Sequence, residues 1–148
     1  MQKAKPDKTK KKAAAKRSPM KPAPERMRVL AEHLSAELAQ WPHVTVKRAF
    51  GMMLAYRGKA VFAALPHTKA IYREDAIMLK FNEEKPAMTR RMESDPRFVF
   101  NPDDTGRSAK AESRKWRHFV IRDETDVHLA IEWLAEAYEL AREPKTRR

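Results

Sequence analysis

The sequence predicts an α+β fold in which helices pack against an antiparallel sheet of about five strands. Apolar residues recur at helical spacing near both ends of the predicted domain, and between residues 44 and 81 the pattern alternates as in strands. The predicted strands follow one another instead of alternating with helices, which is typical of the α+β class. With 148 residues, the chain is long enough for one domain with its own core.

Residues 1–24 combine Lys, Ala and Pro and contain no aromatic residue. Such a segment cannot bury enough apolar surface to offset its ordering entropy, so we expect a disordered basic tail. A helix is predicted over about 25–40, because Pro24 suits a first turn and Trp41-Pro42 ends the helical pattern. The apolar positions of this helix are Met27, Leu30, Ala31, Leu34, Leu38 and Trp41.

The centre of the chain predicts an antiparallel meander. Residues 44–50 alternate with a period of two, Gly51 interrupts, and 52–56 is apolar. Turn residues at 57–59 precede a strand over 61–65 that Pro66 stops, and 76–81 is a further strand. Residues 66–75 are polar and predict a loop, although 70–72 could extend a strand.

The last third of the chain predicts two helices and short strands. Asn82 is suited to cap a helix over 83–93, Phe98–Phe100 forms a short strand, and 101–115 forms a long loop. Residues 116–121 make the last strand, and Asp123 or Thr125 caps a final helix that ends near 141 and carries six acidic residues. The domain is predicted over 25–142, with 143–148 as a short basic tail and the terminal helices on one face of the sheet.

The positive charge lies in the predicted tails. The chain has 32 Lys and Arg against 20 Asp and Glu, a formal net charge of +12. Residues 1–24 carry +8 and residues 142–148 carry +3, whereas 25–141 hold 19 basic and 18 acidic residues. A mobile Lys-rich tail neutralises phosphates without reading bases, so this distribution indicates non-specific attraction to nucleic acid or, alternatively, a solubilising extension.

The candidate nucleic-acid-binding residues form two groups. The first is the tail group, composed of Lys3, Lys5, Lys8, Lys10, Lys11, Lys12, Lys16, Arg17 and Lys21. The second lies in the domain, where aromatic and basic residues interleave around Trp116 and His118; it comprises Arg90, Arg91, Arg114, Lys115 and Arg117. An ordinary solvated face is the alternative interpretation of the second group.

The sequence lacks the residues that most catalytic and metal sites require. It has no Cys, which excludes disulfides, thiolate metal sites and Cys nucleophiles, and three isolated Gly, which exclude a P-loop and a dinucleotide fingerprint. No two His have the i, i+4 spacing of a helical metal site, and no Gly-x-Ser-x-Gly elbow occurs. No apolar run of membrane-spanning length and no secretory signal is recognised. We therefore expect no enzyme, no cofactor, no metal and no membrane association.

Five short segments resemble the family that includes the N-terminal domain of TfoX (Sxy) regulators and the YjbR (MmcQ)-like proteins. They are Arg48-Ala49-Phe50-Gly51, residues 58–63, Ile77-Met78-Leu79-Lys80, residues 116–120, and Ala137-Tyr138-Glu139-Leu140. The resemblance covers about 26–141. Met52 replaces the family's second Gly, and the Pro-Tyr-Tyr strand of the TfoX branch is absent.

The resemblance implies an α+β domain with a twisted antiparallel sheet, a link to DNA binding or transcriptional regulation, and no catalytic residue. Together with the tail, it predicts a small, cytoplasmic, non-enzymatic regulatory or accessory protein that associates with nucleic acid. Two alternatives stay open. One is a protein-interaction module that uses the acidic last helix and a Met-containing apolar face. The other is a small-molecule site in a hydrophobic pocket between the sheet and the helices, lined by Met53, Phe62 and Met78. The sequence leaves the oligomeric state undetermined.

Overall fold

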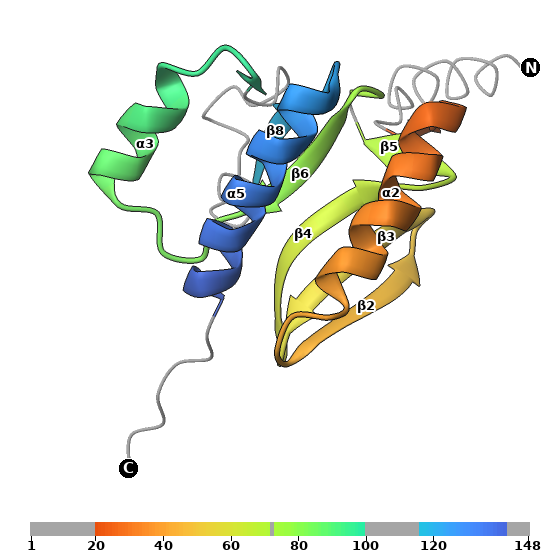
Figure 1. The fold of residues 1–148 in the computed structure, drawn as a ribbon, viewed down its shortest axis with the longest axis horizontal. Coiled ribbons are helices and arrows are strands. Elements are labelled where there is room, and N and C mark those ends of the chain that lie inside the picture. The colour runs from red at the N-terminus through yellow and green to blue at the C-terminus, as the bar shows by residue number, and fades with distance from the viewer. Residues whose placement is uncertain (1–19, 72, 100–115, 142–148) are drawn as a thin grey trace, which may run out of the picture.

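A computed structural model describes residues 20–71, 73–99 and 116–141 of the chain. Its elements follow the order β1 (Met20–Pro22), α2 (Glu25–Leu38), β2 (Val44–Ala49), β3 (Met52–Arg57), β4 (Ala60–Pro66), β5 (Lys69–Ile71), β6 (Ala76–Lys80), α3 (Pro86–Glu93), β7 (Phe98–Val99), β8 (Trp116–Val120) and α5 (Glu124–Leu140). The predicted α+β class is confirmed (Figure 1).

The main sheet has six antiparallel strands in the order β2-β3-β4-β6-β8-β7, so the expected number of about five is too low. The two further strands, β1 and β5, form a separate antiparallel ribbon in which Met20 pairs with Ile71. Residues 20–22, which the sequence assigns to the disordered tail, therefore belong to a strand. Backbone hydrogen bonding to β5 orders them, and composition does not encode this pairing.

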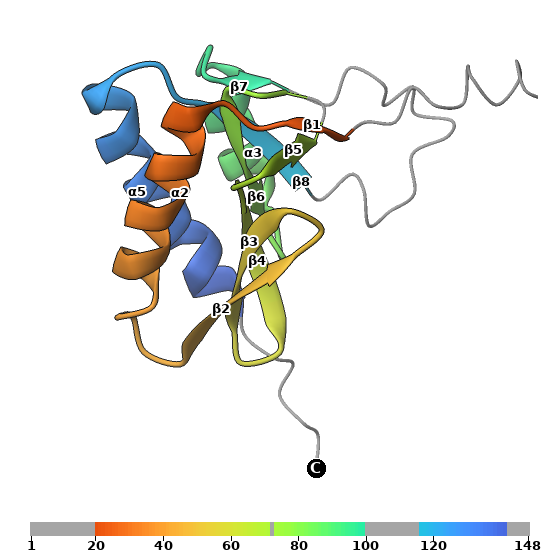
Figure 2. The same cartoon turned by 90° about the vertical axis from the view of Figure 1, so that its right-hand side faces the viewer.

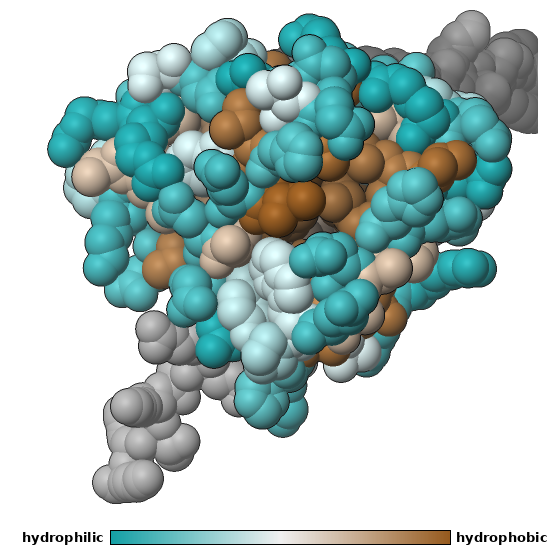
Figure 3. Space-filling view, in the orientation of Figure 1, coloured by the Kyte–Doolittle hydropathy of each residue, from teal (hydrophilic) through white to brown (hydrophobic). Residues whose placement is uncertain are grey.

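The molecule has three layers (Figure 2). Helices α2 and α5 cover one face of the sheet, as expected, and the β1–β5 ribbon lies on the other side. On the helix side, an apolar strip lies in the middle of a polar surface (Figure 3). The face of the sheet that the helices leave uncovered is called here the open face.

The core lies between the sheet and the two terminal helices. Phe98, Phe119 and Trp133 stack edge to face, with ring centroids 4.8–5.0 Å apart, and Phe81 meets Trp133 at 5.9 Å. Such aromatic pairs each add about 1 kcal/mol beyond the burial of their area. At the other end of α5, Tyr138 contacts Phe62 and its hydroxyl donates to the carbonyl of Pro42 at 2.9 Å.

The middle helix begins later than the sequence predicts. Asn82 does not cap it, because its side-chain amide donates to the carbonyl of Val61 at 3.3 Å. The N-cap residue is Lys85, which makes no side-chain capping bond, and Pro86 occupies the first turn. The last helix follows the prediction, since Asp123 is its N-cap and accepts a hydrogen bond from the N–H of Asp126.

Candidate functional site

The open face carries one continuous row of side chains across the six strands of the main sheet. Strand alternation places every second residue on this face, and the antiparallel register sets the row. Its members, in order across the sheet, are Lys47, Leu54, Ala64, Met78, His118 and Val99. The centre of the row is apolar, and cationic or titratable side chains lie toward both sides.

A pocket of about 810 Å³ lies over the β2–β6 side of the open face. Its floor comes from β3, β4 and β6, and the β1–β5 ribbon supplies Met20 and Ile71 as a wall. The lining residues are Met20, Ala49, Phe50, Gly51, Met52, Leu54, Ala64, Thr68, Lys69, Ile71, Met78 and Trp116. An apolar pocket of this size is typical of a binding site for a small ligand or for side chains of a partner.

The rim of the pocket presents Phe50 to solvent. Phe50 and Gly51 form the two-residue turn between β2 and β3, and both have positive φ values, 55° and 77°. Hairpin turns of this kind favour Asn, Asp or Gly, and a bulky residue in this region costs about 1 kcal/mol. The Phe50 side chain is nevertheless 80% exposed. An apolar ring in a strained and solvated position is stabilised by neither burial nor turn chemistry, which marks it as a candidate contact residue.

Hydrogen bonds hold the turn that carries Phe50 against residues 67–69. The carbonyl of Gly51 accepts hydrogen bonds from the backbone N–H groups of Thr68 and Lys69, each at 2.9 Å, and of His67 at 3.3 Å. A Cβ atom at position 51 would lie 2.7 Å from the Cβ of Lys69, so only glycine permits this close approach. The exposed ring therefore projects from a held turn.

Two lysines and a buried histidine belong to the open face. The ammonium of Lys47 lies 5.4 Å from the Tyr56 ring centroid, and that of Lys80 lies 5.8 Å from the Trp116 centroid. His118 is only 3% exposed. Burial, with the positive charge of Arg73, lowers the pKa of His118 to about 4, although Asp75 opposes this shift. The imidazole is therefore neutral at pH 7.

The described residues contain no group of three or more His, Asp and Glu side chains arranged to hold a metal ion. None of the helices in 20–71, 73–99 and 116–141 has the length and apolar character needed to span a bilayer. The open face therefore offers a ligand apolar side chains at its centre and cationic side chains at its margin.

Most of the predicted tail group lies outside the described residues. This applies to Lys3, Lys5, Lys8, Lys10, Lys11, Lys12, Lys16 and Arg17. Lys21 lies in β1, where it is exposed and pairs with Ala70. It lines a second, polar depression together with Arg26 and Arg73. Met20, at the start of the same strand, lines the pocket wall.

The structure describes three of the five cations in the domain group, namely Arg90, Arg91 and Arg117. Arg117 donates to Glu84 at 2.8 and 3.2 Å. Arg91 donates to Glu136 of α5 at 2.7 and 3.1 Å and stacks over the Trp133 ring at 4.5 Å. Arg90 is exposed on α3, and Arg114 and Lys115 lie outside the described residues. Two of the five cations are therefore committed to ion pairs within the fold.

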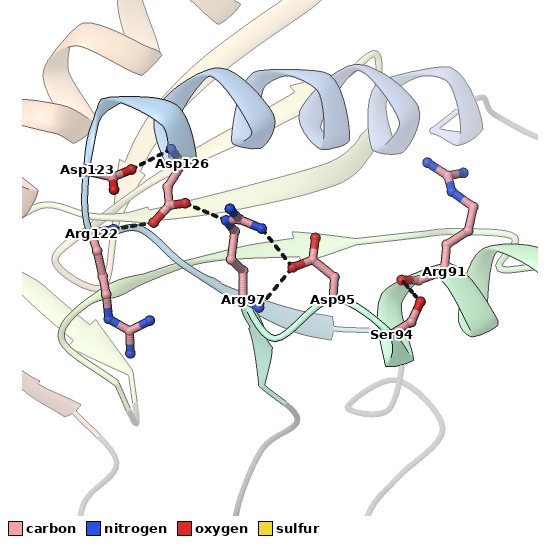
Figure 4. Close-up of polar contacts among 7 residues, drawn as sticks. All are labelled: Arg91, Ser94, Asp95, Arg97, Arg122, Asp123 and Asp126. Atoms are coloured by element: carbon pink, nitrogen blue, oxygen red, sulfur yellow. Dashed lines mark hydrogen bonds and ion pairs between the residues drawn. The ribbon is translucent and has the colours of Figure 1, made fainter.

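Three acidic residues of the last helix also form ion pairs within the fold. Asp126 is buried and accepts from Arg97 Nε and from the backbone N–H of Arg122 at 2.8 Å (Figure 4). Arg97 also donates to Asp95 at 3.1 Å. These bonds, Arg97 first, hold the pKa of Asp126 below its usual range. Glu136 pairs with Arg91, and Glu139 lies 4.0 Å from Arg57.

The pocket differs from the one that the sequence suggests. Met53 and Phe62 lie on the helix side, packed against or within the main core, and only Met78 lines the pocket. Met78 does not join them, because it pairs with Ala64 and therefore lies on the opposite face of the sheet from Met53, which pairs with the core residue Leu65. A β-bulge next to Ala55 and Tyr56 leaves Phe62 without a cross-strand partner and places it with Ala63 on the core side. The residues that sequence analysis missed are Phe50, Leu54 and Met52; a bulky residue immediately before a hairpin glycine was the available signal.

Compared with known proteins, the chain matches no protein-family model, no curated protein and no solved structure.

Proposed function

We propose that the chain is a small, non-enzymatic binding module that holds an apolar segment of a partner protein in the open-face pocket. The observation that carries the proposal is Phe50, which is 80% exposed at positive φ on the rim of an apolar pocket of about 810 Å³. A conformation that costs stability persists where a surface is used for contact. The Met residues at the pocket, Met20, Met52 and Met78, suit a binding surface because their side chains adapt to irregular partners.

The substitution Phe50→Asn distinguishes a role of Phe50 in binding from a role in stabilising the fold. Asn favours positive φ and lacks the apolar ring, so the variant is expected to raise the melting temperature by a few degrees while weakening binding at least tenfold. The measurement starts from random dodecapeptides displayed on phage and selected against the full chain. The affinity of each selected peptide is then compared between the wild type and the variant by fluorescence anisotropy.

Val29→Gln is the matched control. Val29 is the other large apolar side chain that is exposed among the described residues, and it lies on α2, on the helix side of the sheet. The control is expected to bind the selected peptides like the wild type. The proposal is overturned if no peptide is enriched, or if the enriched peptides bind Phe50→Asn as tightly as Val29→Gln.

A second candidate function is non-specific association with nucleic acid through the basic N-terminal segment, in a cytoplasmic regulatory or accessory protein. The net charge of +8 on residues 1–24, beside a nearly neutral domain, favours it. If about six of these cations meet duplex phosphates, the slope of log affinity against log salt is expected to be about −5. Anisotropy titrations of a labelled DNA duplex between 50 and 200 mM salt, concentrations at which such contacts respond strongly, measure this slope.

The comparison chain is the full protein in which the Lys and Arg residues of 1–19 are replaced by Gln. This change leaves β1 and its pairing with β5 intact. Loss of both affinity and salt dependence is the expected result. Unchanged binding by the replaced chain would assign the nucleic-acid contacts to the domain or remove this function altogether.

A further inference from the structure

β2 forms one edge of the main sheet. Its six residues, Val44–Ala49, pair with β3 in a regular antiparallel register, and no other described strand pairs with β2 (Figure 1). The opposite edge strand, β7, has only two residues. Since a sheet edge exposes backbone donors and acceptors to any extended chain, β2 is the longer of the two available templates.

The register shows which backbone groups of β2 point outward. Ala49 and Met52 flank the two-residue turn and therefore form a hydrogen-bonded pair. Alternation then directs the backbone groups of Thr45, Lys47 and Ala49 to β3. Val44, Val46 and Arg48 direct their N–H and C=O groups away from the sheet, and the N–H of Val44 already donates to the carbonyl of Trp41 at 3.2 Å. One added strand could exchange two pairs of backbone hydrogen bonds with Val46 and Arg48.

Charge selects the kind of strand that fits this edge. Lys47 and Arg48 are both exposed, and neither takes part in an ion pair within the described part of the chain. They project to opposite faces of the sheet, Lys47 beside the pocket and Arg48 on the helix side. Like charges directly opposite each other across two strands are destabilising and opposite charges are stabilising, so these cations oppose pairing with a cationic strand and favour an acidic one.

We propose that the partner segment binds by adding to β2 as an antiparallel strand, with two adjacent acidic residues opposite Arg48 and Lys47 and an apolar residue opposite Ala49. This inference rests on the proposed function and names the chemistry of its ligand: an extended, acidic segment of another protein. Ala49 lines the pocket, so the added strand delivers its apolar residue beside Phe50. The edge supplies backbone affinity, and the pocket and the two cations supply specificity.

The register of the proposed pairing with β2 defines the sequence of a peptide probe. In the peptide acetyl-Ile-Glu-Glu-Val-Thr-Val-amide, labelled with a fluorophore, the first residue lies opposite Ala49 and the last opposite Val44. The second and fourth residues direct their N–H groups to β2, whereas the third and fifth direct theirs outward. N-methylation at positions two and four is therefore expected to lower the affinity for the full chain more than tenfold, and N-methylation at positions three and five is expected to leave it nearly unchanged.

Charge exchange tests the second half of the proposal. The variant Lys47→Glu/Arg48→Glu is expected to bind the probe about tenfold more weakly and to bind the peptide in which both Glu residues are Lys more tightly than the wild type does. Arg26→Glu/Arg90→Glu has the same net charge and changes exposed residues away from the edge, so it is expected to bind like the wild type. Recovery of binding by the exchanged peptide shows that the variant is folded.

The outcomes separate this inference from the function on which it rests. If selected peptides respond to Phe50→Asn while both N-methylated probes bind alike, the pocket stands as a binding site and strand addition is overturned. A probe that does not bind the wild type overturns it as well. Sedimentation of the chain as a dimer that Lys47→Glu/Arg48→Glu dissociates would assign the edge to a second copy and would also overturn the proposal.

Discussion

Replacing Asp126 by alanine is expected to lower the free energy of unfolding by about 2–3 kcal/mol and the melting temperature by about 10 °C. The carboxylate of Asp126, on α5, accepts hydrogen bonds from the side chain of Arg97 and from the backbone N–H of Arg122, which follows β8 (Figure 4). Its removal leaves the N–H of Arg122 without this acceptor and takes from Arg97 one of its two carboxylate partners, so that Arg97 pairs with Asp95 alone among the described acids. Urea unfolding at pH 7, followed by circular dichroism, measures the change.

Two further variants test whether the loss of stability comes from the charge and position of Asp126. Asp126→Asn keeps an acceptor for the Arg122 N–H but removes the negative charge, so about half of the loss is expected. Glu132→Ala changes an exposed acid on the same helix and is expected to alter stability by less than about 0.5 kcal/mol. If Asp126→Ala were no more destabilising than Glu132→Ala, the network at the start of α5 would contribute nothing to the fold.

His118 is expected to make the fold sensitive to mild acid. Its pKa is about 4 in the folded chain against about 6.5 in an unfolded one. Between these values the unfolded state binds a proton that the folded state does not, so stability rises with pH there. The contribution is complete well above pH 6.5 and is lost as the pH falls toward 4, by at most about 3.5 kcal/mol in total.

Urea unfolding of the wild type and of His118→Gln at a series of pH values between 7 and 5 tests this. The variant is expected to show a much smaller decline, whereas His33→Gln, at an exposed position on α2, is expected to decline like the wild type. The window ends at pH 5 because ion pairs with Arg97, His67 and Arg73 lower the pKa of Asp126, Glu32 and Asp75, whose protonation adds to the loss at lower pH. Parallel curves for the wild type and His118→Gln would contradict the assigned cause.

Periodicity predicts the elements of this fold well because helical and strand spacing are local properties. The helix at Glu25–Leu38, the hairpin around Gly51 and the cap at Asp123 all follow from short-range patterns. The β1–β5 ribbon does not, since Met20 and Ile71 are far apart in the sequence and β1 carries no strand signal, although 70–72 could extend a strand. The failure of Asn82 to cap is of the same kind, because the competing acceptor, the carbonyl of Val61, comes from another strand.

The candidate site was less predictable than the fold, again for physical reasons. A β-bulge shifts Phe62 to the core side, which alternation alone does not reveal. The ion pairs of Arg91 and Arg117 join elements distant in sequence, so composition does not show that these two cations of the domain group are paired within the fold. Phe50 in a position suited to Asn was visible in the sequence, but its exposure depends on how the turn is held by Thr68 and Lys69.

The position of Met20 has a thermodynamic consequence. This residue lies in the wall of the pocket and directly follows the cationic segment 1–19. Under the two proposed functions, a peptide in the pocket and DNA bound to that segment would act on the same short strand. Linkage then requires reciprocity: whatever factor a bound peptide applies to the equilibrium affinity for DNA, DNA must apply to the affinity for the peptide. A single thermodynamic cycle with the two ligands measures that factor from either side.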